Sequence, residues 1–507
     1  MGSLKRLAGQ TAIYGVGTIL PRVLNYLLTP LYTTLFAPGV FAVFNEGYAY
    51  TAILLVILTY GMETALFHFC TREENRQKVF STAMTAILFT SGAFWILVFL
   101  FSGQLANLMR YPGHEEYVYW LGLIVGLDAI SAIPLAWLRQ LNRPKTFTAI
   151  TLTNIIINIG LNLFFLVYCR HQYIATDGNP SGLVKLLYNP AIGVGYVFIS
   201  NLVASFIKTL LCLPFFFRQK WEFDKELLRR MLSYSWPLLI AGLGFIINER
   251  LDLIMLKFLL PLPHDEAMKQ VGIYSGCYKL AILMSIFIQA YRYAAEPFFF
   301  GQQKEKDSRK VYARIMNYFV ILCCLIFLLV NLYIDVFKHF IRNEQYWEGL
   351  RIVPIIMLAN LFLGIYINLS MWYKLSGHTL FGAWFSLLGA AITIGLNVWL
   401  IPRYGYMASA WTTFVAYFAM MMASYIAGQK HYPIPYNIRK LILYLAVSAF
   451  LYFLSTRLHI RNEVLRIVVN TFFFLPFFFV VYQVEKPVRN FVNATVNRYG
   501  SKSKHRK

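Results

Sequence analysis

Five basic residues interrupt otherwise apolar segments of this 507-residue chain. These segments are long enough to cross a membrane as helices. Arg22 follows Arg6 by about sixteen residues, or ~24 Å of helix, so its side chain lies too deep to reach the membrane surface. A charge at such a depth costs at least ~2.5 kcal/mol and usually faces a bundle interior or a water-filled cavity. The sequence therefore predicts a polar cavity lined by Arg22, Lys208, Arg250, Lys279 and Arg292.

The chemistry of this predicted cavity favours an anionic guest. Arginine and lysine bind phosphate oxygens strongly when they are shielded from water, and arginine can do so through two parallel hydrogen bonds. Tyr48 and Tyr278 lie in the same segments and could stack on sugars and hydrogen-bond to them. A carrier of organic cations would need the opposite charge. We therefore expect these residues to bind an anion that also bears a sugar.

Carboxylates accompany the cations, and Glu46, Asp128 and Asp252 are candidates for coupling transport to an ion. Asp128 has no partner within reach on its own helix. It is either the counter-ion of a lysine on another helix or a relay for protons or sodium. Arg292 and Glu296 are four residues apart on one helix and could instead pair with each other.

The fold class follows from the composition, which is 58% hydrophobic and 14% charged. Apolar runs of spanning length recur along the whole chain and leave no room for a soluble domain. The sequence predicts an all-α polytopic membrane protein with about fourteen transmembrane helices. They are expected near 11–35, 40–67, 80–104, 117–138, 146–168, 191–216, 232–256, 270–299, 312–336, 350–373, 378–401, 404–427, 438–456 and 465–484.

The distribution of basic residues predicts the topology. Most loop lysines and arginines fall on one side if both termini are cytoplasmic, whereas Lys257 falls with the smaller outer group. This asymmetry accounts for the net charge of +23 without nucleic acid as a partner. The basic tail "RYGSKSKHRK" would be attracted to anionic lipids. The six cysteines have no spacing typical of a metal site or disulfides, and we expect no metal and no cofactor.

An internal repeat predicts how the spans are arranged. The segment "INIGLNLFFL" (157–166) returns as "ITIGLNVWLI" (392–401), and "FAVFNEGYAYTAIL" (41–54) aligns with "VGIYSGCYKLAILM" (271–284), which pairs Tyr48 with Tyr278. Six spans separate equivalent positions, so both halves have the same orientation in the membrane. We expect two six-helix lobes, at 1–220 and 221–432, and a C-terminal helix pair with the basic tail at 433–507.

Several motifs carry a resemblance to a known superfamily: "TILPRVLNYLLTPLYTTLFAP" (18–38), "FNEGYAYTAILLVILTYGMETALFHF" (44–69), "LRQLNRP" (138–144) and "NERLDLIMLKFLLP" (248–261). They resemble the Wzx-type polysaccharide flippases of the multidrug/oligosaccharidyl-lipid/polysaccharide exporter superfamily, which also contains the lipid II flippases and the MATE transporters. The resemblance implies two lobes that rock about a central cationic cavity. Arg22 matches the family's cavity arginine, and Arg250, Lys279 and Arg292 match by location. Glu46 stands in a span where lipid II flippases have an arginine.

The function implied by this resemblance is the export of a polyprenyl-diphosphate-linked oligosaccharide, such as an O-antigen or capsule unit. It would pass from the inner to the outer leaflet of a bacterial inner membrane, and the C-terminal helix pair would hold the polyprenyl tail. Glycan assembly enzymes are expected partners. Three alternatives are a lipid II flippase, a MATE-like ion-coupled drug antiporter, and a membrane glycosyltransferase or polymerase. We expect a transporter rather than an enzyme, because the longest outer loop offers only one Asp and one His.

Overall fold

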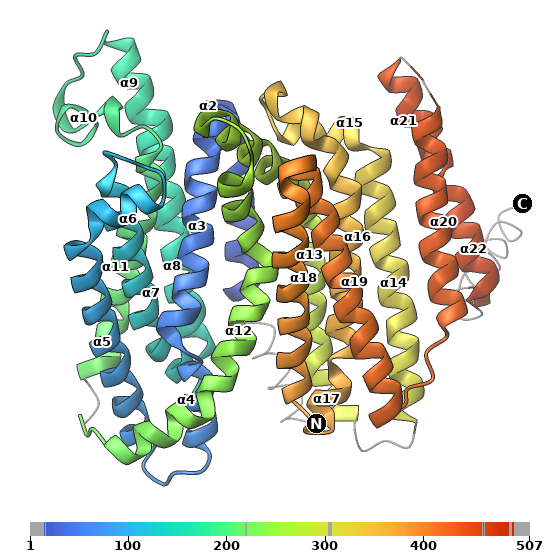
Figure 1. Ribbon diagram of the computed structural model, residues 1–507, viewed down its shortest axis with the longest axis horizontal. Coiled ribbons are helices and arrows are strands. Elements are labelled where there is room, and N and C mark those ends of the chain that lie inside the picture. Colours follow the sequence, from blue (N-terminus) through green and yellow to red (C-terminus); the bar gives the residue numbers. More distant parts are fainter. Residues whose placement is uncertain are drawn as a thin grey trace, which may run out of the picture.

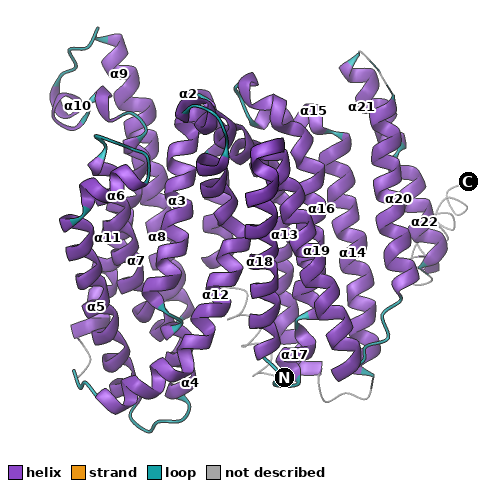
Figure 2. Cartoon of the chain, in the orientation of Figure 1, coloured by secondary structure: helices purple, strands orange, loops and turns teal. Residues whose placement is uncertain are grey.

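The chain is almost entirely helical. A computed structural model describes residues 15, 17–217, 221–302, 307–458, 460, 462–485 and 489–490. Within these ranges every regular element is a helix (Figures 1 and 2). Twelve of the described helical segments are long and apolar enough to span a membrane. They coincide with twelve of the predicted spans, and the all-α polytopic prediction is confirmed.

Residues 29–217 form a first group of helices, which we call the first lobe. The 26-residue helix α7 lies at its centre and packs against α5, α11 and α3. The elements are α2 (Thr29–Leu35), α3 (Pro38–Thr59), α4 (Met62–Cys70), α5 (Arg76–Leu100), α6 (Ser102–Leu108), α7 (Glu115–Gln140), α8 (Pro144–Leu163), the π-helix η1 (Phe164–Cys169), α9 (Arg170–Ala175), α10 (Gly182–Leu187), η2 (Pro190–Ile192) and α11 (Gly195–Phe217).

Residues 225–431 form the second group of helices, which we call the second lobe. In this group α16 packs against α19, and α18 packs against both α12 and α19. The elements are α12 (Lys225–Leu259), α13 (His264–Gln302), α14 (Ser308–Leu332), α15 (Ile334–Phe337), η3 (Lys338–Phe340), η4 (Glu344–Ile352), α16 (Val353–Leu369), α17 (Met371–Leu375), α18 (Leu380–Tyr404) and α19 (Tyr406–His431).

Three predicted spans need comment. The span expected at 11–35 lies partly outside the described residues, and the one expected at 232–256 lies within α12, a helix of 35 residues. The span expected at 40–67 is divided into α3 and α4, because Tyr60 and Gly61 adopt left-handed conformations with φ of 35° and 72°. A side chain on Gly61 would also meet the backbone oxygen of Ser235 on α12 at 3.1 Å. Glycine suits this junction for both reasons.

The two groups of helices stand side by side, and α12 crosses between them (Figure 1). Helix α12 contacts α4 and α5 of the first group as well as α13, α18 and α19 of the second. Helix α3 packs against both α12 and α13. A methyl group on Gly272 would lie only 1.8 Å from the backbone oxygen of Pro38, so α3 and α13 touch backbone to backbone. We call the end of the molecule that bears α9 and α10 the α9 end.

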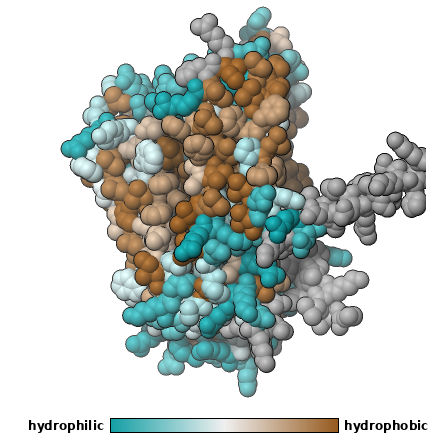
Figure 3. All heavy atoms as spheres, turned by 90° about the vertical axis from the view of Figure 1, so that its right-hand side faces the viewer, coloured by the Kyte–Doolittle hydropathy of each residue, from teal (hydrophilic) through white to brown (hydrophobic). Residues whose placement is uncertain are grey.

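The C-terminal helices are α20 (Ile438–Arg457), α21 (Glu463–Phe472) and α22 (Phe474–Val484). They lie beyond α14, which packs against α20 (Figure 1). Near the α9 end Asn470 donates to the backbone oxygen of Leu332 at 2.6 Å, and Arg466 pairs with Asp335 at 2.6 Å. Figure 3 shows a largely hydrophobic band across this side of the molecule. Exposed side chains such as Phe450 suit contact with lipid chains.

Candidate anion-binding pocket between the lobes

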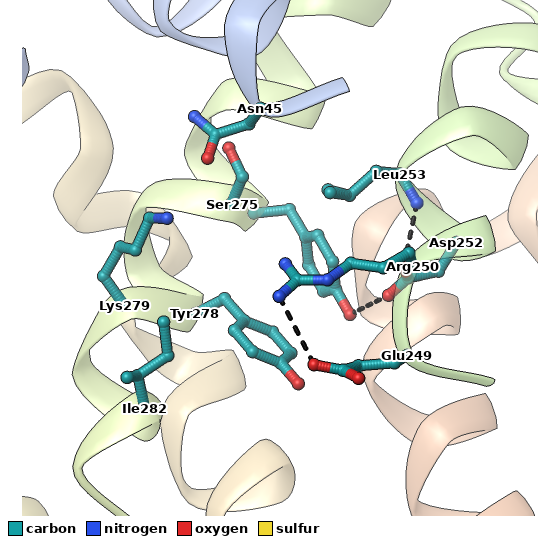
Figure 4. A pocket seen from close by; sticks show the side chains of 10 residues that line it. Asn45, Glu249, Arg250, Asp252, Leu253, Ser275, Tyr278, Lys279 and Ile282 are labelled. Atoms are coloured by element: carbon teal, nitrogen blue, oxygen red, sulfur yellow. Dashed lines mark hydrogen bonds and ion pairs between the residues drawn. The ribbon is translucent and has the colours of Figure 1, made fainter. Parts of the chain in front are cut away.

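A pocket lies where α3, α12 and α13 meet (Figure 4). Helix α3 belongs to the first lobe, whereas α13 belongs to the second, so the pocket is shared between them. Helix α13 presents Tyr274 and Tyr278 one turn apart, which places both on one face. The pocket is lined by Asn45, Glu249, Arg250, Asp252, Leu253, Tyr274, Ser275, Tyr278, Lys279 and Ile282.

Arg250 has a weak partner in this pocket. Its Nη2 lies 3.3 Å from Oε1 of Glu249, and the two side chains are 38% and 36% exposed. Adjacent residues on a helix do not face each other, so the contact requires both side chains to bend together. Charge-assisted hydrogen bonds of good geometry are shorter, at about 2.7–2.9 Å. The guanidinium is therefore only loosely held.

Asp252 is held more firmly, and by neutral groups. It is 4% exposed and accepts a hydrogen bond from the hydroxyl of Tyr274 and another, at 2.9 Å, from the backbone N–H of Leu253. These two donors occupy both carboxylate oxygens. Asp252 is thus fixed in place without forming an ion pair with either cation of the pocket.

Lys279 is the remaining cation of the pocket. Its ammonium has no hydrogen bond and no ion pair within the described part of the chain. Figure 4 shows Lys279 and Glu249 on opposite sides of the pocket, with Arg250 between them. Lys279 is half-buried. A half-buried ammonium without a counter-ion raises the local electrostatic potential and attracts negative charge.

Two other predicted residues pair with each other inside the first lobe. Lys208 on α11 lies 2.7 Å from Asp128 on α7, and both side chains are mostly buried. Of the two roles left open for Asp128, the structure provides the counter-ion of a lysine on another helix. Neither residue lines the pocket.

Glu46 also lies away from the pocket lining, in a fully buried ion pair with Lys257 at 2.9 Å. The positive-inside count places Lys257 with the outer loop cations, and the structure corrects this: the residue is 0% exposed within α12. A signal was present in the sequence, because Glu46 lies deep in an apolar span and needs a cation from elsewhere.

The remaining predicted residues are dispersed. Arg22 is exposed on the helical stretch 17–26 and is not among the residues that line the pocket. Arg292 is half-buried over the ring of Tyr293, at 5.7 Å. Glu296 pairs with Lys374, so the intrahelical alternative in which it pairs with Arg292 is wrong.

Tyr48, the last of the predicted residues, packs inside the first lobe. Its ring lies edge-on to Phe44 and Phe198, with centroids 6.2 and 6.0 Å away. Its repeat partner Tyr278 does line the pocket, 6.0 Å from the ring of Tyr274. The pocket therefore brings together four of the predicted residues: Arg250, Lys279, Tyr278 and Asp252.

Comparison with models of known protein families shows the family of this chain. Residues 7–303, more than half of its length, match the family model described as "Polysaccharide biosynthesis protein". The chain belongs to the polysaccharide biosynthesis protein family. This agrees with the resemblance seen in its motifs. Comparison with curated protein sequences gives no match.

The fold of this family member is similar to the folds of several solved structures. It is similar to the lipid II flippase MurJ in an inward closed conformation, with a TM-score of 0.70 and 13% identity over 93% of this chain and 99% of that one. It is also similar to an inward-facing multidrug resistance MATE family transporter of the MOP superfamily, with a TM-score of 0.60 and 11% identity over 83% and 97%. The MATE multidrug transporter DinF-BH in complex with R6G gives 0.61 and 15% over 85% and 96%.

The cations of this pocket lie near the middle of its helices. Arg250 lies nine residues, or ~14 Å, from the end of α12 at Leu259. A phosphate group that reached Arg250 and Lys279 would find one loosely held cation and one without a partner. The phenol groups of Tyr274 and Tyr278 lie beside them and supply aromatic faces and hydroxyls.

Proposed function

We propose that the chain is a flippase that moves a polyprenyl-diphosphate-linked oligosaccharide across the membrane by alternating access. The observation that carries this proposal is the pocket between the lobes, in which Lys279 has no partner in the described structure and Arg250 has a weak one. Phosphate oxygens are strong acceptors for both groups. The polysaccharide biosynthesis family supports a saccharide as the rest of the cargo.

The energetics favour export of such a substrate if both termini are cytoplasmic, as the basic loops predict. A diphosphate diester carries negative charge, and an inside-negative potential assists its outward movement by ~2.3 kcal/mol per charge per 100 mV. Voltage alone could therefore drive transport. Coupling to a proton or a sodium ion remains an alternative for Glu46, Asp128 and Asp252, although each of these carboxylates has a partner within the protein.

Export of lipid II is the second candidate function, and the fold likeness to the lipid II flippase MurJ favours it. Both candidate substrates carry a diphosphate, so the pocket serves either. A MATE-like drug antiporter is less favoured, because the cation without a partner in the pocket would repel a cationic drug. The transporter fold and the family together support a transporter rather than a glycosyltransferase.

Two partner predictions belong to the same proposal. Enzymes that assemble the glycan would act before and after the chain. Anionic lipids would bind the basic tail, which lies outside the described residues.

The experiment that tests this proposal measures flipping of a labelled polyprenyl-diphosphate oligosaccharide by the full chain in proteoliposomes. Lys279→Met keeps the length of the side chain and removes its charge, and we expect it to reduce the rate at least tenfold. Lys430→Met makes the same change at an exposed residue near the end of α19 and should leave the rate unchanged. Wild-type flipping by a correctly folded Lys279→Met variant would refute the assignment of the pocket. Parallel vesicles with lipid II distinguish the two candidate substrates.

A further inference from the structure

We infer that Glu249 is a displaceable counter-ion, whose carboxylate holds the Arg250 guanidinium while the pocket is empty and yields it to the anionic group of the substrate. The inference rests on the proposed function. It also narrows the class of substrate to anions with two negative charges, such as a diphosphate, because one charge suffices for Lys279 and a second is needed to take Arg250 from Glu249.

The contact between Glu249 and Arg250 is looser than the ion pair of Lys208 with Asp128. At 3.3 Å, with both side chains more than a third exposed, it is longer and wetter than the pair of Lys208 with Asp128, which measures 2.7 Å with side chains 13% and 23% exposed. It also joins adjacent residues of one helix, which do not naturally face each other. Exchange of this partner for a better one costs little.

Asp252 cannot act as a displaceable counter-ion. Its two oxygens accept hydrogen bonds from Tyr274 and from the backbone of Leu253, so its movement would break both bonds and leave the buried hydroxyl of Tyr274 without this acceptor. Its carboxylate stays in place whether the pocket is empty or filled. Of the two carboxylates in the pocket lining, only Glu249 is free to withdraw.

Binding a diphosphate would therefore occur with an exchange of partners. One phosphate would neutralise Lys279, and the other would replace the carboxylate of Glu249 at Arg250. The carboxylate of Glu249 then loses its contact with Arg250, and this loss lowers the net binding energy. Such a penalty limits affinity, and a carrier benefits because its cargo must leave as readily as it enters.

The test measures binding of inorganic pyrophosphate to the full chain in detergent by titration calorimetry. Dimethyl phosphate, which has one negative charge, is the comparison ligand. Glu249→Gln preserves the size of the side chain and removes its charge. We expect it to tighten pyrophosphate binding about tenfold, since the exchange no longer displaces a charge, and to change dimethyl phosphate binding less. At saturating lipid-linked oligosaccharide, flipping should become slower because release is slower.

A thermodynamic cycle separates this role from a structural one. In the background of Arg250→Met the substitution Glu249→Gln should no longer tighten pyrophosphate binding, because Glu249 acts through Arg250. The matched control is Glu63→Gln, since Glu63 is similarly exposed and pairs with Arg139 outside the pocket. Thermal unfolding of each variant establishes that it is folded.

The outcomes separate this inference from the proposed function. Tighter binding that disappears in the Arg250→Met background supports Glu249 as a displaceable counter-ion. Unchanged or weaker pyrophosphate binding by Glu249→Gln, or a gain that persists without Arg250, overturns it and leaves the proposed function standing. If the wild-type chain neither binds pyrophosphate nor flips the lipid-linked oligosaccharide, the proposed function fails and this inference fails with it.

Discussion

The carboxylate of Glu46 on α3 lies 2.9 Å from the ammonium of Lys257 on α12, and neither side chain is exposed to solvent. The hydroxyl of Tyr111 donates to the same carboxylate oxygen, and the Lys257 ammonium lies 3.5 Å from the centre of the Tyr111 ring. Lys257 also donates to the backbone oxygen of Met109, and Arg110 donates to the backbone oxygen of Lys257. The end of α12 is thereby joined to the first lobe.

Lys257→Met should destabilise the protein by about 3–5 kcal/mol, because it leaves the carboxylate of Glu46 buried without a cation. Glu46→Gln should have a cost of the same kind. The double variant should be more stable than the sum of the two losses predicts, since both charges are gone. Unfolding in detergent, followed by the exposure of the buried cysteines, measures these differences. Additive losses would contradict a direct ion pair.

Asp128→Asn should destabilise the first lobe, because it removes the partner of Lys208. If Asp128 serves only as a counter-ion, the double variant with Lys208→Met should recover stability and flip its substrate at a rate close to that of the wild type. The measurement is flipping in proteoliposomes with and without a pH gradient. An inactive but stable double variant would instead identify Asp128 as an ion relay.

Asp224, which caps the N-terminus of α12 outside the membrane spans, predicts a pH dependence of stability. The hydrogen bond from Lys78, together with that from the backbone of Leu227, lowers the pKa of Asp224 from 3.8 to about 2. Because the pKa is lower in the folded state, the contribution to stability is complete above about pH 4 and is lost as the pH falls toward 2.

Acid unfolding of the wild type and of Asp224→Asn measures this contribution. The variant should be less stable at neutral pH and should lose less stability than the wild type between pH 5 and 2. Equal pH dependence of the two proteins would show that the ion pair with Lys78 does not form in solution.

Gly272→Ala should weaken the contact between α3 and α13, because the added methyl group would fall 1.8 Å from the backbone oxygen of Pro38. The nearby Cys277 is 0% exposed and should react faster with a maleimide in the variant, when it is the only cysteine retained. Gly395→Ala is the control, since nothing lies within 4 Å of the added group. Unchanged reactivity of Cys277 would mean that the contact tolerates the methyl group.

The sequence was sufficient to predict the helices and their order, because the hydrophobicity of each span is a local property. Depth along a helix could be read in the same way, and Lys279, expected deep within its span, lies well inside α13. The first predicted span could not be tested fully, since residues 1–14 and 16 lie outside the described part of the chain. The boundaries of the two lobes stay a prediction.

The ion-pair partners of the charged residues could not be predicted from the sequence. Glu46 and Lys257 are 211 residues apart, and their pairing depends on the rotation of α3 and α12 about their axes. The spans are apolar on several faces, so the periodicity that orients a soluble helix gives little guidance here. For the same reason the sequence placed Lys208 in the cavity, although Asp128 neutralises it inside the first lobe.

The left-handed residues Tyr60 and Gly61 break the second span into two separate helices. The backbone of α12 lies against this break at Ser235. A movement of α12 that displaces α4 would therefore bend the chain at residues 60 and 61. The contact between α3 and α13 would be kept during such a movement.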